Sequence, residues 1–545
     1  MLRKNIYKWH RTVSLIIAVP VILWAASGFM HPIMTNIRPK VGTQWLPPQP
    51  VDSNKIKLSL QEVLKQHNIT AISNFRLVQI AGNWFYQLQL PGNNVPQYIS
   101  TQNGKLLQDG DALYARQLGK QFLQGIKKPE KQLLASLHND VMPERMDSSE
   151  AALVHDCCLN ATAAIMNDTS GAKITGVELV ENFDEEYKSI NRLLPAYKVS
   201  FDRADGIRIY VETAQDRFSF AMDNKRAVFD KIFSLFHTMG WLDALGKGKL
   251  VVEILLCLLA FASTIMGLYI FSISKTKKSN GNEIVKARNN HRWTSVLISL
   301  FTLMFTFSGA FHAFDKFSPD TRDQYHASNS FPAAQINFDY SKIAAAVQND
   351  VITNISLVKI ADENYWQVFT KKPSGSGMQK PEAKRSGDLM KEMKVPPPST
   401  AYVNTVTNEI LTGGEKKYAT WLGALFSKQA LQDTTAVTVI TKFEGEYGFV
   451  NKRLPVWKVS YASNNNERYY VETGTGRLAV RVDDKDLYEG YSFSFLHKHH
   501  FMDFAGKSWR DFSTMFWAMA QIAMVAVGLT LYFKMRKRKQ QKSVA

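Results

Sequence analysis

The chain has 545 residues, with 66 Lys and Arg against 48 Asp and Glu, a formal net charge of +18 and 45% hydrophobic residues. This length allows several domains, and three cysteines in the whole chain exclude a fold held together by disulfides. The sequence contains neither CxxC nor CxxCH, which excludes a thioredoxin-like motif and covalently attached c-type haem.

Four apolar segments have the length of a membrane-spanning helix: 12–33, 249–272, 292–314 and 511–533. Sixteen Lys and Arg, against the single acid Glu283, lie before the first segment, in and beside the 273–292 loop, and after the last segment. The positive-inside rule therefore predicts that both termini and the middle loop are cytoplasmic. Most of the net charge then reflects membrane topology, so we expect membrane lipid and no nucleic acid as a partner.

The chain is an internal repeat. The stretch 192–220 resembles 452–480 at an offset of 260 residues, and the first and third apolar segments correspond at an offset of 281. Each half reads as span, exported domain, span, and both halves have the same orientation, which makes a parallel repeat.

This pattern divides the chain as follows: 1–34, N-terminus and first span; 35–235, exported domain A; 236–274, interfacial helix and second span; 275–291, cytoplasmic loop; 292–314, third span; 315–495, exported domain B; 496–533, interfacial helix and fourth span; 534–545, basic tail.

Within the exported domains, a strand–turn–strand pattern recurs at 97–107, 209–220, 401–411 and 469–480. Short amphipathic helices precede the hairpins, at 60–68 and 340–350. We therefore expect four small α+β units, two in each half. The segment 371–400 is rich in Pro, Gly, Ser and charge, and its composition predicts a disordered insertion.

These helix-then-hairpin units, with "YVETGTGRL" as an example, resemble PepSY domains. The spans with "WHR" or "HRW" starts and Ser-Gly before a final His resemble the PepSY-associated transmembrane family. The resemblance covers nearly the whole chain. It implies a four-helix transmembrane bundle with α+β periplasmic PepSY-like domains, in a bacterial inner membrane. It also implies bound haem and a ferrisiderophore reductase.

Histidines mark both ends of the first and third spans. His10 and His31 are 21 residues apart, as are His291 and His312, which is about 30 Å of helix. Imidazoles that face each other from two helices form a natural bis-His site for haem b, because the iron takes one axial nitrogen on each side. His10 and His291 are the clearest candidates for an inner haem.

A third repeated pair, His237 and His497, lies about a dozen residues before the second and fourth spans. Either residue could replace His31 or His312 at an outer haem, so the sequence leaves four candidates for two positions. Arg11 and Arg292 follow the inner histidines directly. They either set topology or pair with haem propionates.

The exported domains contain no catalytic Ser-His-Asp order, HExxH or phosphate-binding glycine loop. An acid, a Tyr and an Arg recur near 186–192 and 446–453 and either lock a hairpin or bind a ligand. His499 and His500 either bind a metal or are clustered surface histidines without a function. Cys157 and Cys158 are free thiols or a vicinal disulfide, and Cys257 is a packing residue.

The leading hypothesis is an oxidoreductase with two haems b. Electrons would come from a cytoplasmic reductase or membrane quinol and reduce a ferric siderophore or another ferric chelate outside the membrane. The alternative is a non-enzymatic, membrane-anchored PepSY protein that inhibits a protease or senses an envelope signal. Transport, suggested by Glu253 inside a span, is a third possibility.

Overall fold

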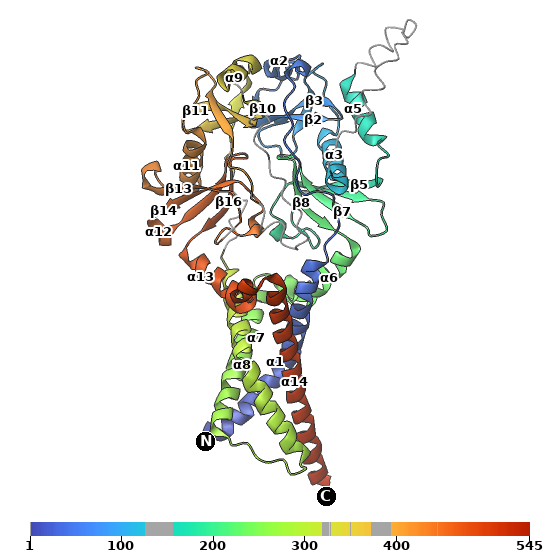
Figure 1. Cartoon of the computed structure of the whole chain (residues 1–545), viewed down its shortest axis with the longest axis vertical. Helices are drawn as coiled ribbons and strands as arrows, with labels where there is room; N and C mark the ends of the chain where they lie inside the picture. The colour runs from blue at the N-terminus through green and yellow to red at the C-terminus, as the bar shows by residue number, and fades with distance from the viewer. Residues whose placement is uncertain are drawn as a thin grey trace. The chain divides into compact units, whose positions relative to one another are not determined.

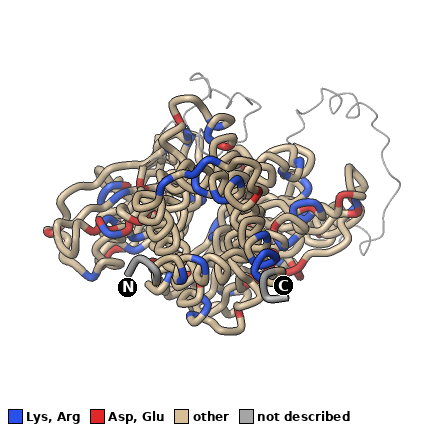
Figure 2. Tube along the Cα trace, turned by 90° about the horizontal axis from the view of Figure 1, so that it is seen from below, with Lys and Arg blue, Asp and Glu red and all other residues tan. Residues whose placement is uncertain are grey.

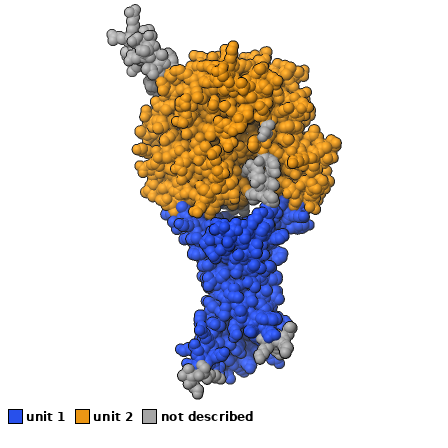
Figure 3. Space-filling model, turned by 180° about the vertical axis from the view of Figure 1, so that it is seen from behind, with its two compact units in different colours: residues 1–38, 225–320, 484–545 blue, residues 39–224, 321–483 orange. Residues whose placement is uncertain are grey.

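A computed structural model describes residues 2–125, 156–318, 326–327, 329–348, 350–371, 394–443 and 445–544. The chain forms two compact units, each built from both halves of the sequence (Figure 3). The first contains residues 1–38, 225–320 and 484–545, and the second contains residues 39–224 and 321–483. Helices 224–236 and 484–492 therefore group mainly with the spans, whereas the sequence analysis had assigned them to the exported domains.

The first unit is a helix bundle. Its elements are α1 (Leu2–Asn36), α6 (Asn224–Phe236), η4 (Gly240–Leu245), α7 (Gly248–Ile273), α8 (Glu283–Asp315), α13 (Asp484–Ser492), η8 (Phe493–His497), η9 (His500–Ala505) and α14 (Lys507–Val544). Four of them, α1, α7, α8 and α14, are long and apolar enough to cross a membrane, as the sequence predicted. A helix satisfies its own backbone polar groups, which is what a segment in hydrocarbon requires.

The ends of these helices extend beyond the apolar segments. α8 begins at Glu283, well before residue 292, because the Asn282 side chain accepts hydrogen bonds from the backbone N–H of Ile284 and Val285. Part of the expected 275–291 loop is therefore helical. Both termini and the α7–α8 connection lie at one end of the bundle (Figure 1), and Lys and Arg residues lie beside both marked termini (Figure 2).

In its described residues, the second unit contains four antiparallel sheets and a short β1–β9 pair, with the strand orders β2-β3-β4, β5-β6-β7-β8, β10-β11-β12 and β13-β14-β15-β16. The strands are β1 (Ala71–Ile72), β2 (Asn74–Ile80), β3 (Asn83–Gln89), β4 (Gln97–Ser100), β5 (Ile174–Val180), β6 (Ala196–Phe201), β7 (Arg208–Glu212), β8 (Arg217–Met222), β9 (Phe331–Pro332), β10 (Val351–Ile360), β11 (Glu363–Lys371), β12 (Thr400–Asn404), β13 (Thr434–Ile440), β14 (Val456–Tyr461), β15 (Arg468–Glu472) and β16 (Arg477–Val482). The last three strands of each half match at the expected offset of 260.

The helices of this unit are α2 (Leu60–Gln66), α3 (Gly110–Gln124), α5 (Cys157–Met166), α9 (Tyr340–Ala346), α11 (Gly414–Ser427) and α12 (Ser463–Asn466), with short turns η1 (Ser53–Lys55), η3 (Ser189–Asn191), η5 (Ala333–Gln335), η6 (Leu431–Asp433) and η7 (Phe449–Asn451). α2 and α9 are the two predicted short helices. Most of the expected insertion 371–400 lies outside the described residues. Cys157, Cys158 and Cys257 are free thiols.

Buried apolar residues hold this unit together. The two three-stranded sheets share one core, in which Phe75 and Trp366 from different halves meet edge to face with ring centres 5.9 Å apart. α3 packs on the β5–β8 sheet, and α11 packs on the β13–β16 sheet. The halves of the repeat are therefore joined through a common hydrophobic core.

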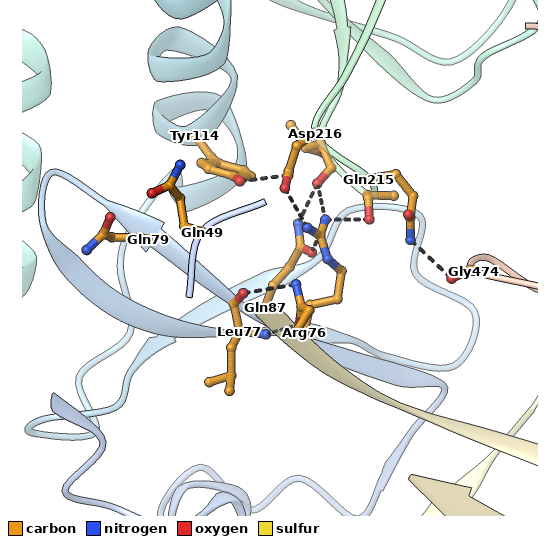
Figure 4. A network of polar contacts seen from close by, with 12 residues as sticks. Gln49, Arg76, Leu77, Gln79, Gln87, Tyr114, Gln215, Asp216 and Gly474 are labelled. Carbon is orange, nitrogen blue, oxygen red and sulfur yellow. Dashed lines mark hydrogen bonds and ion pairs between the residues drawn. The ribbon is translucent and has the colours of Figure 1, made fainter. Parts of the chain in front are cut away.

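A polar network ties strand β2 to the turn between β7 and β8 (Figure 4). Arg76 forms an ion pair with Asp216 at 2.7 Å, and the Tyr114 hydroxyl donates to the same carboxylate at 2.6 Å. Gln215, next to Asp216, donates to the Gly474 carbonyl of the second half at 3.1 Å. These bonds fix turns and inter-strand packing.

The repeated acid–Tyr–Arg stretches have the same structural role. Glu186 pairs with Arg208 at 2.7 Å, and the Tyr187 hydroxyl donates to the Leu193 carbonyl at 2.6 Å. In the second half, the Tyr447 hydroxyl donates to the Arg453 carbonyl at 2.8 Å. These hydrogen bonds and ion pairs hold the turns before β6 and β14 in place.

Candidate functional site

The inner pair of histidines meets inside the bundle. His10 on α1 and His291 on α8 have ring centres 6.4 Å apart and planes inclined at 31°. Nδ1 of His10 lies 3.0 Å from the Ser263 carbonyl oxygen, which can only accept, so Nδ1 carries the proton and Nε2 has a free lone pair. Nδ1 of His291 lies 3.3 Å from the Ser295 hydroxyl. Nδ1 of each ring is engaged, and Nε2 remains available.

Two glycines give these rings space. A Cβ on Gly267 of α7 would lie 3.3 Å from Cε1 of His10, and a Cβ on Gly528 of α14 would lie 3.3 Å from Cε1 of His291. Each first span of a half thus places its histidine against a glycine of the second span of the same half. Neither glycine was predicted from the sequence, although "GLY" and "GLT" recur near the ends of the second and fourth apolar segments.

The outer pair consists of His237 at the end of α6 and His497 at the end of η8, with ring centres 6.0 Å apart. Ser27 donates its hydroxyl proton to the Leu23 carbonyl at 2.7 Å, so it accepts from Nδ1 of His237 at 3.1 Å. The repeated Ser-Gly motif of the first and third spans therefore orients the outer histidines.

The equivalent serine of the third span, Ser308, donates to the Met304 carbonyl at 2.7 Å and lies 3.1 Å from Nδ1 of His497. Burial lowers the pKa of His237 to about 4 and that of His497 well below its ordinary value. Both imidazoles are therefore neutral near pH 7 with Nε2 unprotonated, the form that binds a metal.

His31 and His312 each lie against a phenylalanine that also stacks on a histidine of the outer pair. His31 lies 5.4 Å from the Phe233 ring, and His312 stacks on Phe493 at 4.3 Å. Nδ1 of His312 also lies 2.6 Å from the Glu489 carboxylate. Of the four candidates for the outer position, the structure brings His237 and His497 together face to edge.

The two arginines differ from each other. Arg292 donates to the Ser274 carbonyl at 2.8 Å and covers the Phe271 ring at 4.7 Å, so it caps the C-terminal end of α7. Arg11 is exposed.

Glu253 of α7 has one buried carboxylate oxygen without a hydrogen-bond partner among the described residues.

His499 departs from the expected surface position. It is 0% exposed, whereas its neighbour His500 pairs with Asp503 at 2.7 Å. His499 has a φ of +54°, and this left-handed turn directs the chain inward after His497.

Among the described residues, no group of three or more His, Cys, Asp and Glu is arranged to hold a metal ion by itself.

The separation of the paired histidine rings can be compared with that of two imidazoles on one haem iron. A metal–imidazole nitrogen bond is about 2.0 Å and the ring centre lies about 1.1 Å beyond it, so two axial imidazoles on one iron have centres about 6.2 Å apart. The observed separations are 6.4 Å and 6.0 Å. Ring spacing, neutral imidazoles and Nδ1 partners all fit bis-His haem ligation.

The depth of the outer pair along α1 also matters. Because His237 is bonded to Ser27, it lies at the level of residue 27 and not of residue 31. From residue 10 to residue 27 is about 26 Å of helix, shorter than the span to residue 31.

A scan against protein-family models matches none, and a search of the curated proteins finds no match.

Proposed function

We propose that this protein is a transmembrane oxidoreductase that carries electrons through two haems b to a ferric chelate, such as a ferric siderophore. The observation that supports it most strongly is the pair of facing imidazoles at two levels of the bundle, at 6.4 Å and 6.0 Å. Each of the four rings has Nδ1 beside a serine oxygen and Nε2 left for a metal.

In this proposal His10 and His291 hold the inner haem, and His237 and His497 hold the outer haem. The haem supplies one-electron chemistry at its iron when bound. The serines fix the tautomer and direction of each ring, and the apolar helix faces exclude water. Reduction of the substrate iron to Fe(II) weakens its hold on hard oxygen ligands and releases it from the chelator.

The same proposal gives the location. The basic residues at the termini and the α7–α8 connection favour a bacterial inner membrane with both termini in the cytoplasm. The sheet-containing unit is then periplasmic and supplies a docking surface for the chelate. The sequence resemblance supports the proposal that the sheet-containing unit consists of PepSY-like domains.

The test is the absorption spectrum of the purified full-length protein, oxidised and dithionite-reduced, with pyridine haemochrome quantitation. We expect about two haems b per chain, one lost in His10→Ala and His291→Ala and the other lost in His237→Ala and His497→Ala. The control is His67→Ala, since His67 lies in the sheet-containing unit and bonds the Gly104 carbonyl at 2.7 Å. A colourless protein expressed with ample haem would overturn the proposal and favour the anchored, non-enzymatic alternative.

A further inference from the structure

The seam between α8 and α14 contains a buried nitrogen that no described residue satisfies. Nδ1 of His499 lies 3.0 Å from the Ser513 hydroxyl, while Nε2 is buried without a hydrogen-bond partner among the described residues. The His499 ring stacks on Phe305 at 5.3 Å and 21°. An unpaired polar atom in such an apolar environment is unfavourable unless a ligand or water binds it.

A second unsatisfied nitrogen lies on the same face of α14. Gln521 is 4% exposed; its side-chain oxygen accepts from the Thr302 hydroxyl at 3.0 Å, and its amide nitrogen has no partner in the described chain. Ser513, Trp517 and Gln521 follow at intervals of four, which puts them on one helix face. Trp517 stacks on Phe301 of α8 with ring centres 3.6 Å apart.

These groups belong to the second half alone. The first half has Met239 in place of His499 and Val21 in place of Thr302, and α7 carries no amide side chain. The histidine pairs are repeated in both halves, so haem ligation does not require the seam residues. Polar side chains retained at membrane depth in one half of a repeat indicate a function specific to that half.

We propose that this seam binds the head group of a membrane quinol, which is the electron donor. The proposal rests on the proposed function, because its acceptor is haem. A quinol is a planar ring with an oxygen at each end. One hydroxyl donates to Nε2 of His499, the opposite oxygen accepts from the Gln521 amide, and the ring packs on the aromatic side chains between them.

Two features of α14 bear on how this ligand would reach and span the seam. Residues 513 and 521 are about 12 Å apart along the helix, and the Gln521 side chain leans toward the N-terminus, which shortens the gap. Phe512 and Phe516 on α14 are 58% and 52% exposed and offer an apolar approach from the lipid. An acyl chain has no polar atom to bond either nitrogen. Water could bond both nitrogens, but its binding would not depend on the aromatic side chains between them.

Oxidation of the quinol to quinone breaks two O–H bonds. Where haem is bound, its two ferric irons would each take one of the two electrons, and the two protons would pass to water at the outer end of the bundle. The hydroxyl that loses its proton first is the one that donates a hydrogen bond to His499. Gln521 holds the opposite oxygen.

The experiment uses full-length, haem-loaded protein in lipid nanodiscs, mixed anaerobically with decylubiquinol or menadiol while the haem spectrum is recorded. We expect rapid reduction in the wild type and at least tenfold slower reduction in His499→Leu and Gln521→Leu, with unchanged haem content and dithionite-reduced spectra. His500→Gln is the control, since His500 pairs with Asp503 outside the seam. Quinone extracted from the purified protein should fall in the two seam variants.

The outcomes separate the two proposals. Haem that dithionite reduces but quinol does not would overturn the donor proposal and leave the proposed function standing. Absence of haem would overturn the proposed function, and quinone content would then decide whether the seam binds quinone. If His499→Leu loses haem, the Gln521→Leu variant decides the question. Reduction of its haem by quinol at the wild-type rate would overturn the seam as the donor site.

Discussion

The Ser27 hydroxyl accepts a hydrogen bond from Nδ1 of His237 at 3.1 Å, although the two residues are 210 positions apart in the chain. Ser308 and His497 repeat this contact at 3.1 Å. The bond keeps the proton on Nδ1 and leaves the lone pair on Nε2, so α1 determines which atom of a distant histidine could bind the proposed haem iron.

We therefore expect Ser27→Ala to weaken outer-haem binding by about 10- to 100-fold, the usual effect of removing a partner of a metal-ligating histidine. The outer haem should also shift to a higher reduction potential, because the imidazole becomes a weaker donor. Haem titration and spectroelectrochemistry measure both effects. Ser272→Ala is the matched control, because among the described residues that hydroxyl bonds only the Tyr269 carbonyl of its own helix.

Gly267→Ala should disturb the inner haem. The new Cβ would lie 3.3 Å from Cε1 of His10, closer than ordinary contact, so the ring must move. Low-temperature electron paramagnetic resonance should show an altered inner-haem signal, and haem retention during purification should fall several-fold. Gly28→Ala should leave the spectrum unchanged, since its Cβ would meet Cε1 of His237 only at 3.9 Å. Equal effects in both variants would contradict this account.

His31→Ala and His312→Ala should both retain two haems per chain, because neither ring faces another histidine and His312 is bonded to Glu489 at 2.6 Å. Pyridine haemochrome quantitation checks this directly. Loss of the outer haem in either variant, with retention in His237→Ala, would reverse the assignment of the outer ligands.

Part of this architecture follows from residue pattern alone. The four spans, the 260-residue repeat of β6–β8 with β14–β16, and the facing of His10 and His291 are local or symmetric consequences of hydrophobicity and spacing. A serine also follows each inner histidine by four residues, at Ser14 and Ser295, and this repeated spacing marks the inner pair in the sequence.

The outer site depends on information that no local pattern contains. The choice of His237 over His31 is set by how far α6 and η8 reach down beside the spans, which is a tertiary property. The burial of His499 but not His500 depends on one left-handed backbone turn. The α8–α14 seam was missed because Thr302 and Gln521 are isolated polar residues in apolar segments, and their pairing needs helix packing.

Glu472 gives a prediction for the sheet-containing unit. Burial alone would raise its pKa, but Arg217 and Arg453 outweigh it and lower the pKa to about 2. Its carboxylate lies 2.8 Å from Arg453 and also bonds Arg217 of the first half. Because the folded-state pKa is depressed, this contribution to the free energy of unfolding is fully present above about pH 4.5 and is lost as the pH falls toward 2.

Glu472→Gln should therefore lower the free energy of unfolding at pH 7 by about 3 kcal/mol, since it removes the carboxylate that the fully buried Arg453 and the partly buried Arg217 share. It should also flatten the loss of stability between pH 4.5 and 2. Thermal unfolding of the full-length protein in detergent, followed by circular dichroism across this pH range, measures both effects. Glu178→Gln is the matched control, because Glu178 is 63% exposed and its pair with Lys198 is 3.4 Å long, so its effect should stay below about 0.5 kcal/mol. An acid profile of Glu472→Gln that parallels the wild type would show that this carboxylate does not carry the pH dependence.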